Sequence, residues 1–310
     1  MKTVALTVLA YEGPMLRAYL GMMRRTGLQP RRILLMVQRS HPATKKAIGR
    51  WLPESLRVPY AQRVQEYALN YWPRRIRGSH PRLVEAMARQ LTRICDDPAG
   101  LIAEMLGRVR YENYAPSVER VLVGGLGDGV LAATFSKLKP AAVLYTGGGI
   151  VPPSLLNMGG LRFLHVHPGH LPAVRGADGL LWSTLVRGRP GVSCFCLAGG
   201  IDTGAVIDAV DYPPLSFDIS ALPRPDDQTL YRAIFSFYDP ILRADFLVSR
   251  VLEAGADPAA LPASPQDPRQ GITYHFMHPA LRRKALERLF VSTASQKTAA
   301  HSSCRMPAAV

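Results

Sequence analysis

The chain of 310 residues is poor in cysteine, in acidic side chains and in long apolar runs. Its four cysteines are too few and too scattered for a disulfide framework in a chain of this length, so we expect reduced thiols. No uncharged apolar run reaches the roughly 18 residues that a membrane-spanning helix needs, and the first ten residues lack the basic flank and cleavage site of a signal peptide. We therefore expect a cytoplasmic protein with no membrane partner.

The shortage of acidic residues is concentrated in the first part of the chain. Residues 1–120 hold 21 Lys and Arg against 9 Asp and Glu, whereas the rest of the chain holds 17 against 14. Such an excess favours anionic partners, but it is equally compatible with a plain solvated surface. The aromatic and basic stretch 71–77 is best explained as an exposed helix entry, so nucleic acid is not an expected partner.

Short apolar runs alternate with helical patterns along much of the chain. Apolar residues recur at helical spacing from Met15 to Met23, between two strand-like runs. This alternation is typical of a parallel sheet with helical crossovers, and it predicts a doubly wound, Rossmann-like α/β domain. The candidate strands are 3–10, 32–37, 118–124, 141–145, 162–166 and 192–197.

Two segments depart from this alternation. Residues 41–116 are rich in Arg and helical in pattern, which predicts a helical insertion between strands. Residues 213–290 are Pro-rich and helical, with a long helix from Gln228 to Glu253 that we expect to be interrupted at Asp239-Pro240. The chain is therefore expected to have a catalytic domain over 1–212, a small helical C-terminal appendage over 213–290 and a disordered tail over 291–310.

Two histidines and an aspartate are the strongest candidates for chemistry. On a strand, His165 and His167 project from the same face, and Pro168 ends the strand directly after them. Open α/β sheets bind their ligands at this end of the strands. Further along, glycines on both sides of Asp202 allow a tight turn that can bring its carboxylate toward an imidazole.

The motifs His167-Pro168, Leu171-Pro172, 175–178 and 200–204 resemble the signature of the folate-dependent formyltransferases. That family includes the glycinamide ribonucleotide, methionyl-tRNA and sugar N-formyltransferases. The resemblance implies a formyltransferase fold and formyl transfer from 10-formyltetrahydrofolate, as cosubstrate, to an amine. The acceptor is expected to be a small molecule or carrier-bound, and can be anionic. Methionyl-tRNA is not the expected acceptor, because the segment after Pro213 is helical in pattern rather than β-rich.

The resemblance also implies a role for each site residue. His167 and Asp202 correspond to the family's histidine and aspartate, which assist attack of the amine on the formyl group. His165 replaces the family's asparagine, and we expect it to donate a hydrogen bond to the oxyanion. The loop after strand 141–145 stands where the family receives the pterin ring. The expected cofactor-binding residues are Gly148, Gly149, Ile150, Val151, Gly200 and Ile201.

The histidine in place of asparagine keeps two other hypotheses open. His165, His167 and Asp202 are chemically suitable ligands for zinc or iron, which would make the protein a metal-dependent hydrolase or lyase on the same fold. A catalytically inactive protein that binds polyanions through residues 1–120 is the other alternative. Bound metal at unit stoichiometry would favour the first, and salt-sensitive binding that ignores substitution of His167 would favour the second.

Overall fold

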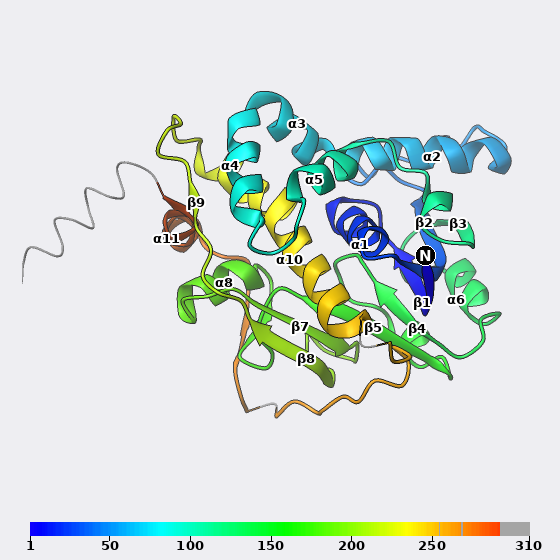
Figure 1. Ribbon diagram of the computed structural model, residues 1–310. Helices are drawn as coiled ribbons and strands as arrows, with labels where there is room; N and C mark the ends of the chain where they lie inside the picture. The colour runs from blue at the N-terminus through cyan, green and yellow to red at the C-terminus, as the bar shows by residue number, and fades with distance from the viewer. Residues whose placement is uncertain (254, 268, 292–310) are drawn as a thin grey trace, which may run out of the picture.

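The computed structural model describes residues 1–253, 255–267 and 269–291 (Figure 1). Except for Val291, the predicted disordered tail lies outside the described residues. Seven strands form the central sheet: β1 (Lys2–Ala10), β2 (Leu28–Gln38), β3 (Val118–Val123), β4 (Ala141–Tyr145), β5 (Leu161–His167), β7 (Gly191–Cys196) and β8 (Val206–Asp211). The strand order is β3-β2-β1-β4-β5-β7-β8. The first five are parallel, and β7 and β8 continue the sheet in antiparallel pairing.

The chain reverses its direction of travel across the sheet between β1 and β4. It leaves β1 toward β2 and β3, then returns to pair β4 with the other edge of β1. This arrangement creates a topological switch point at the carboxyl ends of the two strands. The seven-stranded sheet confirms the predicted α/β class.

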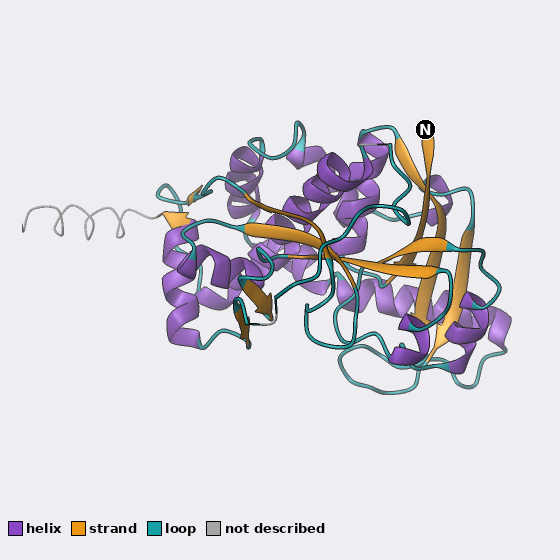
Figure 2. Cartoon of the chain, turned by 90° about the horizontal axis from the view of Figure 1, so that it is seen from below, coloured by secondary structure: helices purple, strands orange, loops and turns teal. Residues whose placement is uncertain are grey.

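Helices cover both faces of the sheet, which explains why its central strands are apolar on both sides. Within β1, Val8 contributes to one hydrophobic cluster and Leu9 to the other, as the period-two alternation of a strand requires. Helices α1 (Pro14–Arg25) and α10 (Asp239–Phe246) bury residues in the first cluster, and α6 (Gly129–Phe135) and α7 (Pro153–Leu156) in the second. The strands fan out across the view of Figure 2, because the sheet is strongly twisted.

The predicted insertion 41–116 contains four α-helices and one short 3-10 turn. They lie between β2 and β3 in the chain and pack on the side of the sheet that carries α1 (Figure 1). Their bounds are α2 (Glu54–Leu69), α3 (Tyr71–Ser79), α4 (Pro81–Leu91), α5 (Pro98–Leu106) and η1 (Tyr111–Asn113).

The helix expected to be interrupted at Asp239-Pro240 is continuous instead. Helix α9 (Asp227–Ala233), the π-helical turn η2 (Ile234–Tyr238), α10 and a second π-helical turn η3 (Leu247–Leu252) follow one another without a break. Pro240 lies in the first turn of α10, directly after the wider π turn, where its ring and missing N–H are tolerated.

The C-terminal segment is part of the core, although the sequence predicts an appendage. Helix α10 packs against α1 in front of the sheet (Figure 1), and its apolar side chains are fully buried. The remaining elements are β6 (Val174–Gly176), α8 (Gly179–Val186), β9 (Phe217–Asp218), β10 (Ile272–Tyr274), α11 (Pro279–Leu289) and β11 (Phe290–Val291), with β6 paired to β10 and β9 to β11. Over the residues described here, no helix has the length and apolar character needed to cross a membrane.

Candidate functional site

A cavity of about 320 Å³ lies at the switch point. It is lined by the turn after β1, the end of α2, the loop after β4, one histidine of β5, and the continuous helical segment η2–α10. The lining residues are Tyr11, Glu12, Gly13, Pro14, Met15, Leu69, Thr146, Gly147, Gly148, His165, Phe235, Asp239 and Arg243. A larger hollow of about 400 Å³ beside α4 is lined by no histidine or nucleophile, so we locate the candidate site at the switch point.

His165 faces this cavity from β5, flanked by the rings of Tyr145 and Phe195. Its Nδ1 lies 3.0 Å from the carbonyl oxygen of Tyr145, which can only accept, so Nδ1 carries the hydrogen. Burial and the charge of Arg243 lower the pKa of His165 to about 4, which makes the ring neutral at pH 7. Nε2 then holds a lone pair. The expected role of His165 as oxyanion donor therefore does not fit this geometry.

His167 and Asp202 contact each other at the carboxyl end of β5, and neither belongs to the cavity lining. Nδ1 of His167 lies 3.3 Å from Oδ2 of Asp202, and Nε2 lies 3.0 Å from the carbonyl oxygen of Val174. Asp202 has a left-handed backbone with φ 54°, and its Oδ2 accepts a hydrogen bond of 2.8 Å from the backbone N–H of Gly176. Burial lowers the pKa of His167, and the negative charge of Asp202 opposes that shift.

The contacts of His167 determine where protons must lie. Because Val174 offers only a carbonyl oxygen, Nε2 of His167 must be the donor there. A second proton, on either Nδ1 or Asp202, is then needed for a favourable Nδ1 to Oδ2 contact. The pair can therefore hold one exchangeable proton between an imidazole and a carboxylate.

Close packing of the His167 ring explains why a glycine stands at position 169. A Cβ atom at Gly169 would lie 2.5 Å from Nε2 of His167 and 2.5 Å from the carbonyl oxygen of Val174. Real Cβ atoms do not approach other atoms so closely, so only glycine can occupy position 169 with the His167 ring where it is.

The predicted cofactor-binding residues are dispersed. Gly148 lines the cavity, and its carbonyl oxygen accepts a 2.6 Å hydrogen bond from the hydroxyl of Tyr145. Val151 is buried in the second hydrophobic cluster, so it cannot contact a ligand without rearrangement. Ile150 and Ile201 are exposed outside the cavity and could contact only a ligand that extends beyond it. Gly149 and Gly200 also lie outside the lining, and both have positive φ, 93° and 148°.

Two neighbouring glycines of this loop are expected to respond differently to substitution. A Cβ at Gly147 would lie 2.5 Å from the Tyr145 hydroxyl, whereas a Cβ at Gly148 would have no atom within 4 Å. Gly147→Ala should therefore lower the free energy of unfolding by about 1–3 kcal/mol through overpacking. Gly148→Ala should stay within about 0.5 kcal/mol of the wild type. Urea unfolding of both variants checks this, and equal stabilities would mean that Tyr145 is not fixed against the loop.

Asp239 and Arg243 of α10 belong to the cavity, and the sequence interpretation missed both. Arg243 donates from Nη1 to the carbonyl oxygen of Val166, at 2.9 Å, and from Nη2 to Oδ2 of Asp239, at 2.6 Å. Val166 lies between the two histidines, so Arg243 anchors the backbone that carries both. The available signal was an Asp and an Arg four residues apart within a helix that is otherwise apolar on that side.

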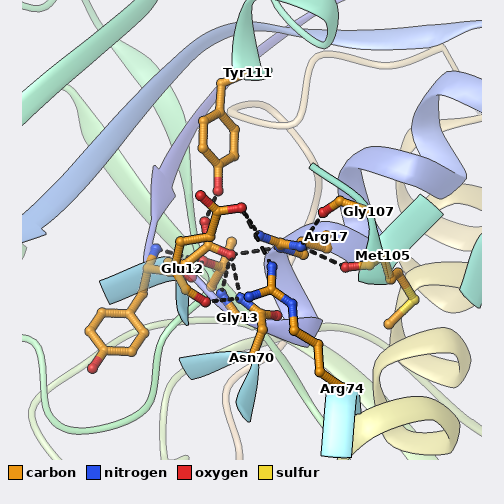
Figure 3. Close-up of polar contacts among 11 residues, drawn as sticks. Glu12, Gly13, Arg17, Asn70, Arg74, Met105, Gly107 and Tyr111 are labelled. Atoms are coloured by element: carbon orange, nitrogen blue, oxygen red, sulfur yellow. Dashed lines mark hydrogen bonds and ion pairs between the residues drawn. The ribbon is translucent and has the colours of Figure 1, made fainter. Parts of the chain in front are cut away.

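A buried ionic network holds the turn after β1 (Figure 3). Arg17 contacts Glu12 at 2.7 Å and Glu66 at 2.9 Å, and it donates to two backbone carbonyls around the end of α5. Asn70 and the hydroxyl of Tyr111 also donate to Glu12. The network links the helical insertion to the wall of the cavity and leaves no oxygen of Glu12 without a donor.

The ligand set of the metal hypothesis is not assembled. The described part of the chain contains no group of three or more His, Cys, Asp or Glu side chains that could hold a metal ion. Nδ1 of His165 and both ring nitrogens of His167 already face protein oxygens. The geometry therefore does not favour a centre built from these histidines and Asp202.

Comparison with known proteins gives partial matches, and no family model matches the chain. Methionyl-tRNA formyltransferases from Syntrophus aciditrophicus (strain SB) and Synechococcus sp. (strain JA-3-3Ab) are 33% identical over 86 residues and 36% identical over 80 residues. These segments are 27% and 25% of this chain, and they span about a quarter of each relative, 27% and 24%. A sugar N-formyltransferase structure from Shewanella sp. FDAARGOS_354 aligns over 93% of this chain and 88% of its own at 13% identity, with a TM-score of 0.45. The two sequence matches confirm the resemblance to formyltransferases that the motifs indicate.

Proposed function

We propose that the protein transfers a formyl group from 10-formyltetrahydrofolate to the amine of a small-molecule or carrier-bound acceptor. The observation that carries this proposal is the 3.3 Å approach of His167 Nδ1 to Asp202 Oδ2, at the end of the strand whose His165 lines the cavity at the switch point of the sheet. The two sequence relatives bear the name of a formyltransferase and support the same reaction class.

The reaction needs a proton to move between two nitrogen atoms. The amine nitrogen attacks the formyl carbon, a C–N bond forms, and the carbonyl oxygen becomes an oxyanion. The bond from that carbon to N10 of the folate then breaks, and N10 gains a proton as tetrahydrofolate leaves. His167 and Asp202, which share a proton in the buried pair, are the groups we assign to stabilising the intermediate and to this proton movement.

Folate binding is proposed for the loop after β4 and the turn around Asp202. Gly148 opens onto the cavity, and a side chain built there would meet no atom within 4 Å, so a flat ligand can approach the backbone closely. Exposed Ile150 and Ile201 would contact the part of the folate that extends out of the cavity.

A thermal-shift titration with a stable 10-formyltetrahydrofolate analogue tests the proposal, together with metal analysis of the same preparation. A ligand that binds only the native state stabilises it by about 2.7 kcal/mol at 100 times its Kd. We therefore expect the melting temperature to rise by roughly 5 °C or more at saturation. No shift, together with stoichiometric zinc or iron, would replace formyl transfer with the metal-dependent hydrolase or lyase.

A further inference from the structure

The chemistry of the cavity wall limits what the cavity can hold. It contains two acidic side chains, Glu12 and Asp239, and one basic side chain, Arg243. Glu12 is paired with Arg17, and Asp239 is paired with Arg243. Among the lining residues, all of which are described, none is an unpaired cation that could receive a phosphate or carboxylate. The other side chains are mostly apolar or aromatic: Tyr11, Pro14, Met15, Leu69 and Phe235. The cavity is therefore suited to an uncharged, partly apolar group.

Asp239 leaves hydrogen-bonding capacity unused beside this cavity. Its side chain is 2% exposed, its Oδ2 pairs with Arg243, and its Oδ1 is buried without a hydrogen-bond partner. Nε of Arg243 is also buried without a partner. Buried polar atoms are nearly always satisfied in native proteins, so this carboxylate oxygen retains the capacity to accept one more hydrogen bond at the cavity wall.

His165 supplies a second acceptor in the same cavity. The carbonyl oxygen of Tyr145 fixes the hydrogen on Nδ1, which leaves the lone pair on Nε2. Arg243 stabilises this arrangement in two ways, through its bond to Val166 and through a positive charge that disfavours protonation of the ring. The wall thus combines two acceptors, His165 and Asp239, with no free cationic donor.

We infer that the part of this cavity lined by His165 and Asp239, as distinct from the part at Gly148 proposed to receive the folate, is the acceptor subsite. It takes a primary amine on an uncharged body, with His165 Nε2 and the Asp239 carboxylate accepting its two N–H groups. The inference rests on the proposed function. With both hydrogens held, the lone pair of the amine is free to attack the formyl carbon. As the C–N bond forms, the amine gives up one proton, which the proposed His167 and Asp202 pair transfers to N10 when the bond from N10 to the formyl carbon breaks. His165 Nε2 acts only as a hydrogen-bond acceptor that holds the amine. Arg243 is a positioning residue.

Histidine-selective 15N NMR of the full chain tests the ring state directly. The resonances of His165 are identified by their loss in His165→Gln, and exposed His275 serves as reference. We expect His165 to be protonated on Nδ1 only at pH 7, with a titration midpoint well below the usual value for a histidine. A His165 ring protonated on Nε2 at pH 7 would overturn the inference.

Hydroxylamine, a small neutral amine analogue at pH 7.5, probes the subsite. Titration should shift the Nε2 resonance of His165 and leave His275 unchanged, and Asp239→Asn should weaken this response at least fivefold. Asp211→Asn, which alters an acidic group outside the cavity, is the matched control and should not change the response of His165.

The outcomes separate the two proposals. No shift of His165, or equal responses in both variants, rejects the subsite. An intact amine response with no thermal shift by the folate analogue would instead reject the proposed function alone.

Discussion

Arg17→Met is expected to lower the free energy of unfolding by about 3–5 kcal/mol, the usual cost of removing one partner from a buried ion pair. Arg17 is almost completely buried and neutralises both Glu12 and Glu66. Without it, two carboxylates remain in the interior, and the carbonyl groups that Arg17 contacts lose their donor. Because Glu12 lines the cavity, the turn after β1 should lose its fixed conformation as well.

The matched control for this prediction is Arg25→Met, on the same helix. Arg25 contacts Asp97 at 2.9 Å, where both side chains are substantially exposed, and Glu104 at 3.5 Å. Glu104 keeps its closer 2.9 Å contact with Arg24 when Arg25 is replaced. An exposed pair contributes little, so this variant should lose less than about 1 kcal/mol. Urea unfolding of the two variants gives the comparison, and similar losses would show that the network around Arg17 contributes no more than a surface ion pair.

His167→Asn is expected to reduce kcat/KM for formyl transfer by roughly 100- to 10,000-fold, the range typical of acid–base groups. The variant removes the ring that contacts Asp202 at 3.3 Å and that fills the space against Gly169. Release of tetrahydrofolate from 10-formyltetrahydrofolate in the presence of a panel of primary amines measures the effect, and Asp202→Asn should cause a loss of the same order.

His170→Asn is the control for that experiment, because the chain contains a second histidine–aspartate contact close by. Nδ1 of His170 lies 3.1 Å from Oδ1 of Asp211, but this carboxylate already pairs with Arg187 at 2.5 Å, and His170 lies beyond the end of β5, the strand that carries His165 into the cavity. Its loss should change kcat/KM less than threefold. If His170→Asn is as damaging as His167→Asn, the acid–base assignment is wrong.

The parts of the fold that could be predicted from sequence are those with strong local patterns. Strand β4 matches its predicted range residue for residue, and β5 and β7 do so within one residue at each end, because continuous apolar runs mark buried strands. Strand β8 was missed, since it is half-buried along its length and carries Asp208 and Asp211. The three-residue pairing of β6 with β10 joins segments about a hundred residues apart, which no local pattern can indicate.

The candidate site likewise contains some residues that a local sequence pattern marks and others that depend on contacts distant in the sequence. The His-x-His strand end and the glycine-flanked Asp202 are local motifs, and the sequence was sufficient to single them out. The state of His165 depends on Tyr145 of another strand and on Arg243 of a distant helix, so its tautomer could not be predicted from the motif. For the same reason, Asp239 and the network around Arg17 appear only when the tertiary contacts are known.

The packing of α10 against α1 has a consequence for the order in which the site is built during synthesis. Every residue that the motifs single out has been made once Gly204 is linked to the growing chain, but one wall of the cavity has not. Helix α1 and the β1 turn must wait for the segment that carries Asp239 and Arg243 before their apolar surface is covered. A ribosome-bound chain that stops before α10 should therefore contain both histidines and Asp202 and yet have no binding site.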